Sequence, residues 1–270
     1  NAGFDIMGCL GSEFALVNLA PYKDNVLLNL STSILIILGG IGFLVIKDLI
    51  NNKFRWKKFS MHTKVVLSMT LILLTGGTIL LKLTEGEKIT WLGAFFTSVS
   101  ARTAGFSTFA LKEFSVAGLF LIICLMFVGA SPGSTGGGIK TTTVFALFLG
   151  IKSSATNKSE KAFHYSMPKD VYKKASVIAL LSLFVITFST FIVSVFDPQF
   201  TLTQILFEMT SAFGTVGLST GITPTLSVGS KIVSILVMFI GRLGPLTIAS
   251  LWTFSRGESF SYPQGNISVG

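Results

Sequence analysis

The chain carries little charge and little cysteine. Only 12% of its 270 residues are charged, about half the share found in soluble domains, so an ordinary soluble protein and a disordered chain are both disfavoured. Two cysteines, Cys9 and Cys124, are too few for a disulfide scaffold. Neither a Ser-His-Asp set nor paired carboxylates stand out, so an enzyme is not expected. Half of the residues are hydrophobic and the mean hydropathy is +0.72, which predicts a membrane protein with several spans.

Apolar segments of about 20 residues are long enough to cross a membrane as helices. None of those found here has the shape of a signal peptide, with a cationic start and a short apolar core. The segments that we expect to span the membrane are 25–46, 65–81, 114–139, 175–196 and 231–254.

Basic residues gather in two connections, 47–64 and 152–174, which together hold 12 of the 21 lysines and arginines. Most acidic residues lie in the opposite connections. By the positive-inside rule, both basic loops face the cytoplasm. Alternatively, the two basic loops form a docking surface for an acidic cytoplasmic partner. Nucleic-acid binding is not expected, because it needs a solvated basic patch.

Two apolar segments, 89–101 and 201–207 with its flanks, are too short to span and are typical of re-entrant or core helices. Each precedes the same phrase, which reads SARTAGFST from Ser100 and SAFGTVGLST from Ser211. Gly105 and Gly217 lie 112 residues apart in these phrases. The chain also opens with Asn-Ala-Gly-Phe, a weaker third copy. The repeated unit is therefore a span, a short helix, a glycine turn and a second span.

This unit has a specific physical use. A short helix that ends inside the membrane directs its negative C-terminal dipole toward the following turn. Carbonyl groups exposed in that turn can replace the hydration shell of a cation, and glycine permits the backbone angles that the turn needs. The sequence thus predicts a cation filter made of backbone oxygens, from Asn1, Ala2, Gly3, Thr103, Ala104, Gly105, Thr215, Val216 and Gly217.

Two other functions remain open from the residues alone. A non-conducting membrane scaffold or receptor subunit would keep the repeat for packing only. A proton-coupled carrier would normally place acidic residues within its spans, and the five spans expected here contain none.

The repeats resemble the Ktr/Trk/HKT potassium transporters, above all the membrane subunit of a bacterial Ktr-type uptake system. The most specific element is GASPGSTGGGIKTTT at 129–143, which is similar to the intramembrane loop that interrupts the second span of the third unit in that family. The resemblance implies an all-α membrane protein of repeated span–pore helix–filter loop–span units, with a potassium-channel-like, pseudo-fourfold pore when complete. The chain would hold only part of the four units, so we expect it to belong to a longer protein.

The resemblance also implies an organisation of the chain. The end of the second repeat occupies 1–50 and is followed by a cytoplasmic loop at 51–64. The third repeat covers 65–150, with the gate loop at 129–143, and a second cytoplasmic loop covers 151–174. The fourth repeat covers 175–254, and 255–270 form a cytoplasmic tail.

The glycine-rich loop nearly fits a phosphate-binding motif, but Ile139 moves Lys140 one residue out of register and no strand precedes the loop. Five glycines and a proline within 129–138 instead predict a break in a membrane helix. Below a filter, such a loop would obstruct the pore and act as a gate, whereas a simple packing break is the alternative. The residues that we assign to the gate are Gly129, Ser131, Pro132, Gly133, Ser134, Thr135, Gly136, Gly137, Gly138, Lys140, Thr141 and Arg242.

Arg242 is the only charge within 232–254. An unpaired charge at this depth costs several kcal/mol, by order of magnitude. We therefore expect Arg242 to face the pore or a polar partner rather than lipid. The resemblance implies that this partner is the gate loop, which Arg242 would hydrogen-bond and hold closed, with a packing or snorkelling arginine as the alternative. Arg102 is expected to anchor the filter loop. Glu208 is expected either to brace the same region or to lower the electrostatic potential at the pore mouth. His62 and His164 have no cysteine or acidic cluster beside them, so a metal site is not expected.

The function that follows is passive or ion-coupled potassium translocation across the cell membrane. Potassium is the expected ion, sodium is expected only as a coupling or activating ion, and no organic cofactor is expected on this chain. The resemblance further implies a homodimer of membrane subunits in the lipid bilayer, seated on a cytoplasmic nucleotide-binding regulatory ring.

Overall fold

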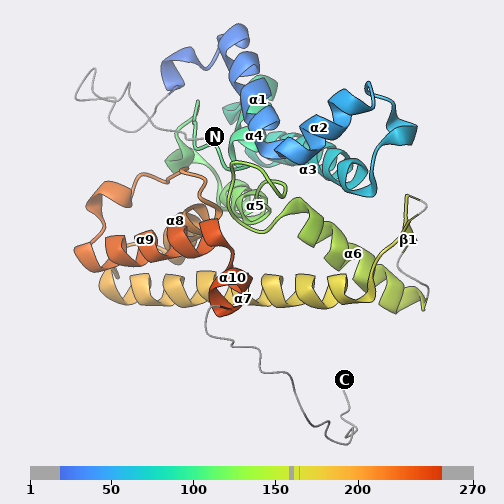
Figure 1. Ribbon diagram of the computed structural model, residues 1–270. Coiled ribbons are helices and arrows are strands. Elements are labelled where there is room, and N and C mark those ends of the chain that lie inside the picture. Colours follow the sequence, from blue (N-terminus) through green and yellow to red (C-terminus); the bar gives the residue numbers. More distant parts are fainter. Residues whose placement is uncertain (1–18, 158–160, 164, 251–270) are drawn as a thin grey trace, which may run out of the picture.

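A computed structural model describes residues 19–157, 161–163 and 165–250 of the chain, and these residues are almost entirely helical (Figure 1). Short 3-10 turns occur at Ala20–Tyr22, Trp56–Lys58, Gly86–Lys88, Leu111–Glu113 and Thr223–Thr225. A small antiparallel hairpin pairs β1 (Lys161–Ala162) with β2 (Tyr165–Ser166). The α-helices are α1 (Val26–Ile41), α2 (Phe43–Asn51), α3 (Met61–Glu85), α4 (Trp91–Ser100), α5 (Val116–Phe127), α6 (Thr141–Thr156), α7 (Lys169–Phe196), α8 (Leu202–Gly214), α9 (Val228–Leu243) and α10 (Pro245–Ser250).

The same plan occurs twice in the helix order. A long helix, a short helix, a loop and a second helix follow one another as α3, α4 and α5, and again as α7, α8 and α9. Hydroxyl side chains begin the corresponding helices, because they accept hydrogen bonds from N–H groups that have no partner within the helix. Thr90 and Thr201 cap the short helices, and Ser115 and Ser227 cap the second helices.

The membrane-crossing helices differ from the five continuous spans that hydropathy predicts. Among the described residues, only 61–88 and 170–196 are long and apolar enough to cross a membrane as single helices, and a bent pair made of α1 and α2 is a third candidate. Every described second helix is interrupted. The α1–α2 pair bends by 95° at Gly42, α9 ends at Gly244, and the segment 128–140 separates α5 from α6.

Glycine explains two of these three interruptions. Gly42 and Gly244 have φ angles of 86° and 92°, in the region that glycine enters at little cost and other residues avoid. Both follow helices of 16 residues, α1 and α9. Gly42 also lies so close to the loop between α5 and α6 that an added Cβ would be 2.6 Å from the Pro132 carbonyl oxygen. The predicted span 25–46 therefore ends early, because its last residues belong to α2.

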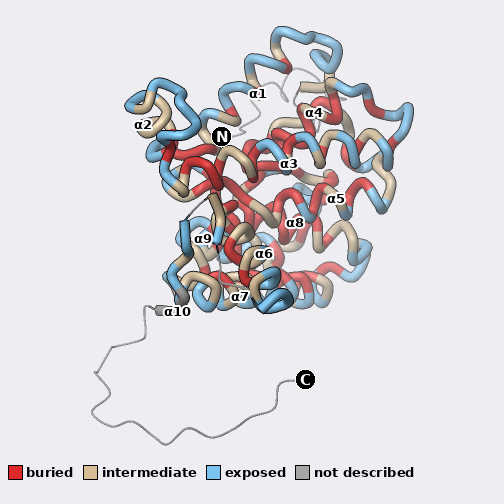
Figure 2. Tube along the Cα trace, turned by 90° about the vertical axis from the view of Figure 1, so that its right-hand side faces the viewer, coloured by how far each residue is buried: buried red, intermediate tan, exposed pale blue. Residues whose placement is uncertain are grey.

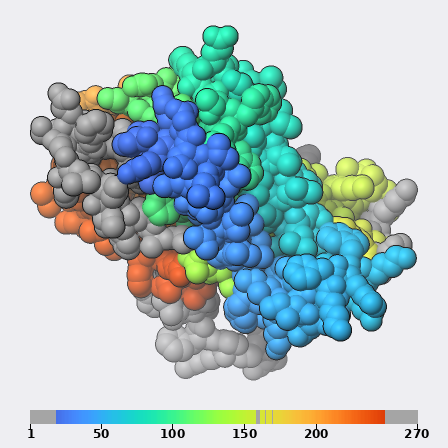
Figure 3. Space-filling model, turned by 90° about the horizontal axis from the view of Figure 1, so that it is seen from above, coloured from blue at the N-terminus to red at the C-terminus, as the bar shows by residue number. Residues whose placement is uncertain are grey.

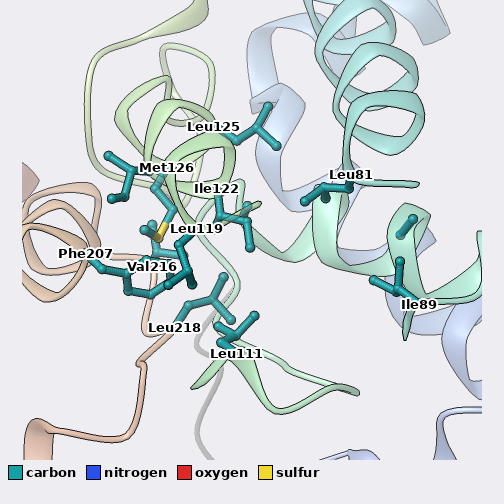
Figure 4. Packing of buried hydrophobic residues seen from close by; sticks show 13 residues of the cluster. Leu81, Ile89, Leu111, Leu119, Ile122, Leu125, Met126, Phe207, Val216 and Leu218 are labelled. Carbon is teal, nitrogen blue, oxygen red and sulfur yellow. The ribbon is translucent and has the colours of Figure 1, made fainter. Parts of the chain in front are cut away.

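Buried side chains gather where α3, α5 and α8 meet, and the outer faces of the helices are exposed (Figure 2). The largest cluster joins α5 to the loops that follow both short helices (Figure 4). Val216 and Leu218 from the second of these loops pack there with Ile122, Met126 and Phe207. Between membrane helices such close packing, rather than expulsion from water, supplies the attraction. The core therefore lies directly behind the candidate filter.

Candidate functional site

The two predicted filter loops leave the C-terminal ends of the short helices in the same way. Thr103 follows α4 with φ 71°, and Thr215 follows α8 with φ 50°. Two residues later, Gly105 and Gly217 have φ angles of 83° and 95°. A left-handed threonine costs about 1–2 kcal/mol, and residues held in such conformations cluster at functional sites. Both loops thus adopt a backbone form that their composition alone would not favour.

The loops also approach each other closely at their glycines. A Cβ added to Gly105 would lie 2.5 Å from the Val216 carbonyl oxygen and 3.2 Å from the Cα of Gly217. A Cβ on Gly217 would have only an ordinary contact, 3.4 Å from the Cα of Gly105. The glycine of the third unit is therefore required for space as well as for its backbone angle.

Serines at the ends of the short helices fasten the loops. Ser100 donates its hydroxyl to the Phe106 carbonyl, and Ser211 accepts a 3.2 Å hydrogen bond from the Gly217 N–H. In the fourth unit, the buried carboxylate of Glu208 accepts hydrogen bonds from four groups: the Ser219 hydroxyl, the Thr220 N–H and hydroxyl, and the Thr223 hydroxyl. Glu208 therefore braces the backbone directly after the filter, in the region that sequence reasoning indicated. A hollow of about 350 Å³ lies beside this loop.

The predicted gate loop lies directly against the filter. Gly136 and Gly137 contact the two filter threonines so closely that added Cβ atoms would be 2.1 Å from the Thr103 hydroxyl oxygen and 2.6 Å from that of Thr215. The Gly137 N–H also donates a 3.1 Å hydrogen bond to the Thr215 hydroxyl. Glycine is thus what lets the main chain of the loop reach the filter. Figure 1 shows this loop beside the end of α5, near the middle of the helix assembly.

The neck of the gate loop is closed by its own residues. Val128 and Ile139 form a parallel bridge, and the Ser131 and Thr141 hydroxyl oxygens lie 3.1 Å apart. Nothing in this arrangement matches a phosphate-binding loop, because α5, not a strand, precedes it. The loop is a compact excursion between two halves of an interrupted helix.

Basic side chains hold three carbonyl groups of this loop. Arg102 donates from Nη2 to the Gly129 carbonyl at 3.3 Å, and Lys140 Nζ donates to the Gly136 carbonyl at 2.6 Å. Arg242 donates from Nη1 to the Thr135 carbonyl. Hydrogen bonds from charged groups are the strongest of their kind in proteins, at about 1.5–3 kcal/mol. Arg102, expected to anchor its own filter loop, thus reaches across to the start of the gate loop.

The break between α1 and α2 forms a second seat for the gate loop, which sequence reasoning missed. The Ser131 N–H donates to the Gly40 carbonyl at 3.0 Å, and the Thr135 N–H donates to the Gly39 carbonyl at 3.3 Å. In return, the Phe43 N–H donates to the Gly133 carbonyl at 3.1 Å. The run Gly39-Gly40-Ile41-Gly42 was the available signal, since it ends an otherwise apolar helix with three glycines.

Some of the remaining predicted residues lie outside the described part of the chain, and others lie in the gate loop. Asn1, Ala2 and Gly3 lie outside the described residues, and so do Cys9 and His164. Pro132, Gly133, Ser134 and Gly138 lie within the gate loop, where Gly133 and Gly138 have positive φ angles. In the part of the chain that the structure describes, no three His, Cys, Asp or Glu residues gather as metal ligands would.

Comparisons with known proteins identify the family of this chain. Residues 10–262 match the family model described as TrkH, cation transport protein. The potassium/sodium uptake protein NtpJ of Enterococcus hirae is 37% identical over 291 residues, and the alignment covers all of this chain and 61% of NtpJ. The Ktr system potassium uptake protein B of Bacillus subtilis is 34% identical, with 94% of this chain and 59% of that protein covered. The chain thus spans about three-fifths of the length of these relatives.

A solved structure has the same fold. The crystal structure of the potassium transporter TrkH from Vibrio parahaemolyticus matches 92% of this chain and 53% of its own, with a TM-score of 0.67 at 19% identity. The match of the family model over nearly the whole chain, the two relatives above 30% identity and the shared fold point the same way. This chain is a membrane protein of the TrkH cation transport family, a family of transporters rather than enzymes.

Proposed function

We propose that the chain forms part of a potassium uptake pore, with a filter of backbone carbonyls and a gate formed by the loop 129–143. The third and fourth units contribute two walls through Thr103–Gly105 and Thr215–Gly217, and Asn1–Gly3 contribute a third. Potassium is the transported ion, and sodium acts, if at all, as a coupling or activating ion. The names of the relatives NtpJ and Ktr protein B support uptake of these ions.

One observation carries the gate assignment: the contact of the loop with both filter threonines. A loop whose main chain touches Thr103 and Thr215 leaves no room there for a hydrated cation. A pore needs such an obstruction to be removable, and a loop held by a few hydrogen bonds meets that need better than a packed helix does. The scaffold alternative assigns no role to this contact.

The same proposal extends to the assembly. A Ktr-type membrane subunit would form a homodimer and would be regulated by a cytoplasmic nucleotide-binding ring. The name of the Bacillus subtilis relative, a component of a Ktr system, supports partner subunits of this type. The two basic loops supply positive charge on the side where such a ring would bind.

Reconstitution tests the proposal. The full-length protein in vesicles should pass potassium faster than sodium, and the variant Gly217→Ser should reduce the potassium-to-sodium permeability ratio. A protein that is folded and oriented in the vesicles but passes neither ion, with or without the regulatory ring, would favour the scaffold. An unchanged ratio in Gly217→Ser would remove this glycine from the filter.

A further inference from the structure

The helix α2 leaves the membrane-crossing direction abruptly. It is bent by 95° from α1, whose composition is apolar and which carries exposed leucine and isoleucine side chains. A helix perpendicular to a membrane-crossing helix runs roughly parallel to the membrane plane. Because α2 leads into the connection that the positive-inside rule assigns to the cytoplasm, its far end lies toward the cytoplasmic side. Figure 1 shows α2 extending sideways from the lower end of α1.

The side of α2 that packs on the protein is apolar, and so is much of the opposite side. Val45 is fully buried, in a cluster with Ile41 and Val66. On the other side, Phe43 and Ile50 are 63% and 64% exposed, and one edge of the Phe43 ring lies beside Gly133 of the gate loop. Large apolar side chains on an outward face need a partner, since contiguous apolar surface exposed to water is rare in proteins.

The turn after α2 adds aromatic and basic side chains to the same surface. Phe54 is 74% exposed, and Trp56 is 47% exposed, with its ring held at one side by Phe59 and Phe163. Tryptophan is typical of the headgroup level of membranes. The basic residues of this surface are all exposed, namely Lys47, Lys53, Arg55, Lys57 and Lys58.

Asp48, the single acidic residue of this segment, is occupied elsewhere. Its carboxylate accepts hydrogen bonds from the Asn52 amide, the Ser60 N–H and hydroxyl, and the Thr63 hydroxyl. It therefore ties α2 and the turn to the start of α3 rather than pairing with the basic side chains around it. The segment 43–58 is held rigidly and presents a positive, partly aromatic surface.

We propose that the segment 43–58 is a membrane-surface element that binds the headgroups of anionic phospholipids in the cytoplasmic leaflet. Clustered basic residues directly after a membrane helix attract anionic lipid, and the apolar side chains enter the boundary between headgroups and acyl chains, as in surface-bound amphipathic helices. A cytoplasmic protein would complement the charge, but Phe43, Ile50 and Phe54 favour lipid because they lie beside an apolar, membrane-crossing helix. Figure 3 shows this segment, in light blue, projecting from the edge of the molecule.

This surface is connected to the gate loop at Phe43, the first residue of α2. Phe43 donates its N–H to the Gly133 carbonyl, and its ring lies beside the same glycine. Lipid bound to α2 would thereby steady the gate loop at Gly133. That connection rests on the function proposed above, whereas lipid binding itself does not.

Fluorescence quenching tests the lipid site without measuring transport. The full-length protein is prepared with Trp56 as its only tryptophan, by replacing the others, including Trp91 and Trp252, with phenylalanine. It is placed in phosphatidylcholine vesicles that contain either brominated phosphatidylcholine or brominated phosphatidylglycerol at equal mole fraction. We expect Trp56 to be quenched by both lipids, and more by the anionic one. Acrylamide in the water should quench it weakly.

Charge neutralisation supplies the matched comparison. In Lys53→Gln/Arg55→Gln/Lys57→Gln/Lys58→Gln, the preference for the anionic lipid should be lost, because each basic residue near a membrane surface contributes about fivefold to this attraction. The control Lys152→Gln/Lys161→Gln/Lys173→Gln/Lys174→Gln removes the same charge from exposed residues of the other basic loop, and it should keep the preference.

Three results would overturn the proposal. Quenching by acrylamide but not by either lipid would place the segment in water, available to a soluble partner. Protection of Trp56 from every quencher would mean that protein covers the segment. Equal loss of lipid preference in both quadruple variants would assign the attraction to the total cytoplasmic charge rather than to this surface.

Discussion

The outer ends of the third and fourth units have the same arrangement of an acidic side chain and a capping serine. They differ in the length of the acid and in the size of the residue beside it. In the third unit, the carboxylate of Glu85 at the end of α3 accepts hydrogen bonds from the N–H and hydroxyl of Ser115, the residue that caps α5. In the fourth unit, Asp197 after α7 accepts the same two bonds from Ser227, which caps α9. Each acid thus fixes the start of the second helix of its own unit.

The side chain three positions after each capping serine differs in size in the opposite sense to the acidic side chain beside it. Beside the longer Glu85 stands Gly118, where an added Cβ would lie 2.0 Å from the Glu85 Oε1. Beside the shorter Asp197 stands Ser230, whose hydroxyl, with the N–H and hydroxyl of Ser227, lowers the pKa of Asp197 to about 2. Asp197 is therefore charged at all physiological pH values.

The inner halves of the two units differ much more than these outer ends. The second helix of the fourth unit is interrupted by a single glycine, Gly244, whereas that of the third unit is interrupted by the whole segment 128–140. The repeat is thus kept where it holds the filter and abandoned where the gate loop lies. Under the proposed function, this contrast separates positions expected to support selectivity from positions expected to control access. The following variants test that separation in the full-length protein.

Deleting Ser131–Gly138 should change transport most, because it makes the third unit resemble the fourth. We expect potassium flux per folded protein to rise about tenfold, the effect of lowering a barrier by about 1.4 kcal/mol. The potassium-to-sodium ratio should stay near that of the parent. Flux would be measured in vesicles and normalised to the amount of protein that elutes as a single species. Flux that falls together with that amount would favour a packing break over a gate.

Serine substitution of the filter glycines should affect the two units unequally. Gly105→Ser should reduce the potassium-to-sodium permeability ratio more than Gly217→Ser, because only Gly105 lies against the Val216 carbonyl. Both variants carry the cost of a left-handed side chain, about 1–2 kcal/mol. Gly76→Ser is the control, since a Cβ at this position in α3 meets no atom within 4 Å. Equal, unchanged ratios in both filter variants would argue against these loops as the filter.

Substitutions of the two arginines that hold the gate loop should have different effects. Arg242→Gln removes the bond to the Thr135 carbonyl, and we expect flux to rise a few-fold with an unaltered potassium-to-sodium ratio. Its guanidinium is exposed, so the effect is smaller than for a buried charged hydrogen bond. Arg102 is buried, and Arg102→Gln should lower the yield of folded protein instead. An Arg242→Gln protein that conducts and responds to regulation like the parent would remove this residue from the gate.

The reciprocal pairs at the outer ends should affect stability more than transport. Gly118→Ser alone should destabilise the protein by about 1–3 kcal/mol, because the hydroxymethyl group overlaps the Glu85 carboxylate. Adding Glu85→Asp should restore most of that loss by recreating the arrangement of the fourth unit. The thermal inactivation midpoints of the parent, both single variants and the double variant show whether the two substitutions are coupled. Strictly additive effects of the two substitutions would mean that the side-chain sizes at positions 85 and 118 are independent of each other.

Much of this site follows from local sequence. The short helices and the glycine turns were predictable, because hydropathy gives the length of an apolar segment and the matching phrases give the position of the turn. The interruption at 129–138 was predictable from five glycines and a proline. Local sequence predicted a polar partner for Arg242 and the family resemblance implied the gate loop, where Arg242 donates to the Thr135 carbonyl. That these residues gate a pore stays a prediction.

The rest depended on contacts that hydropathy does not encode. The segment 25–46 is equally apolar whether it is straight or bent, so the 95° turn at Gly42 and the seat that it forms for the gate loop were missed. The reciprocal sizes at Glu85 and Asp197 involve residues 30 or more positions apart along the chain. The contact of Gly137 with Thr215 arises only when the third and fourth units fold against each other, and that of Gly136 with Thr103 joins residues 33 positions apart.

The gate loop is bound to α1 and α2 by main-chain hydrogen bonds. The protection of these amides therefore reports the position of the loop without an attached label. The amides of Ser131, Thr135 and Phe43 each donate to a carbonyl on the other side of the contact. Any movement that lifts the loop from its seat must release all three together. Their hydrogen–deuterium exchange, measured by mass spectrometry on peptides that contain these residues, would therefore count gate openings even when no ion crosses the membrane.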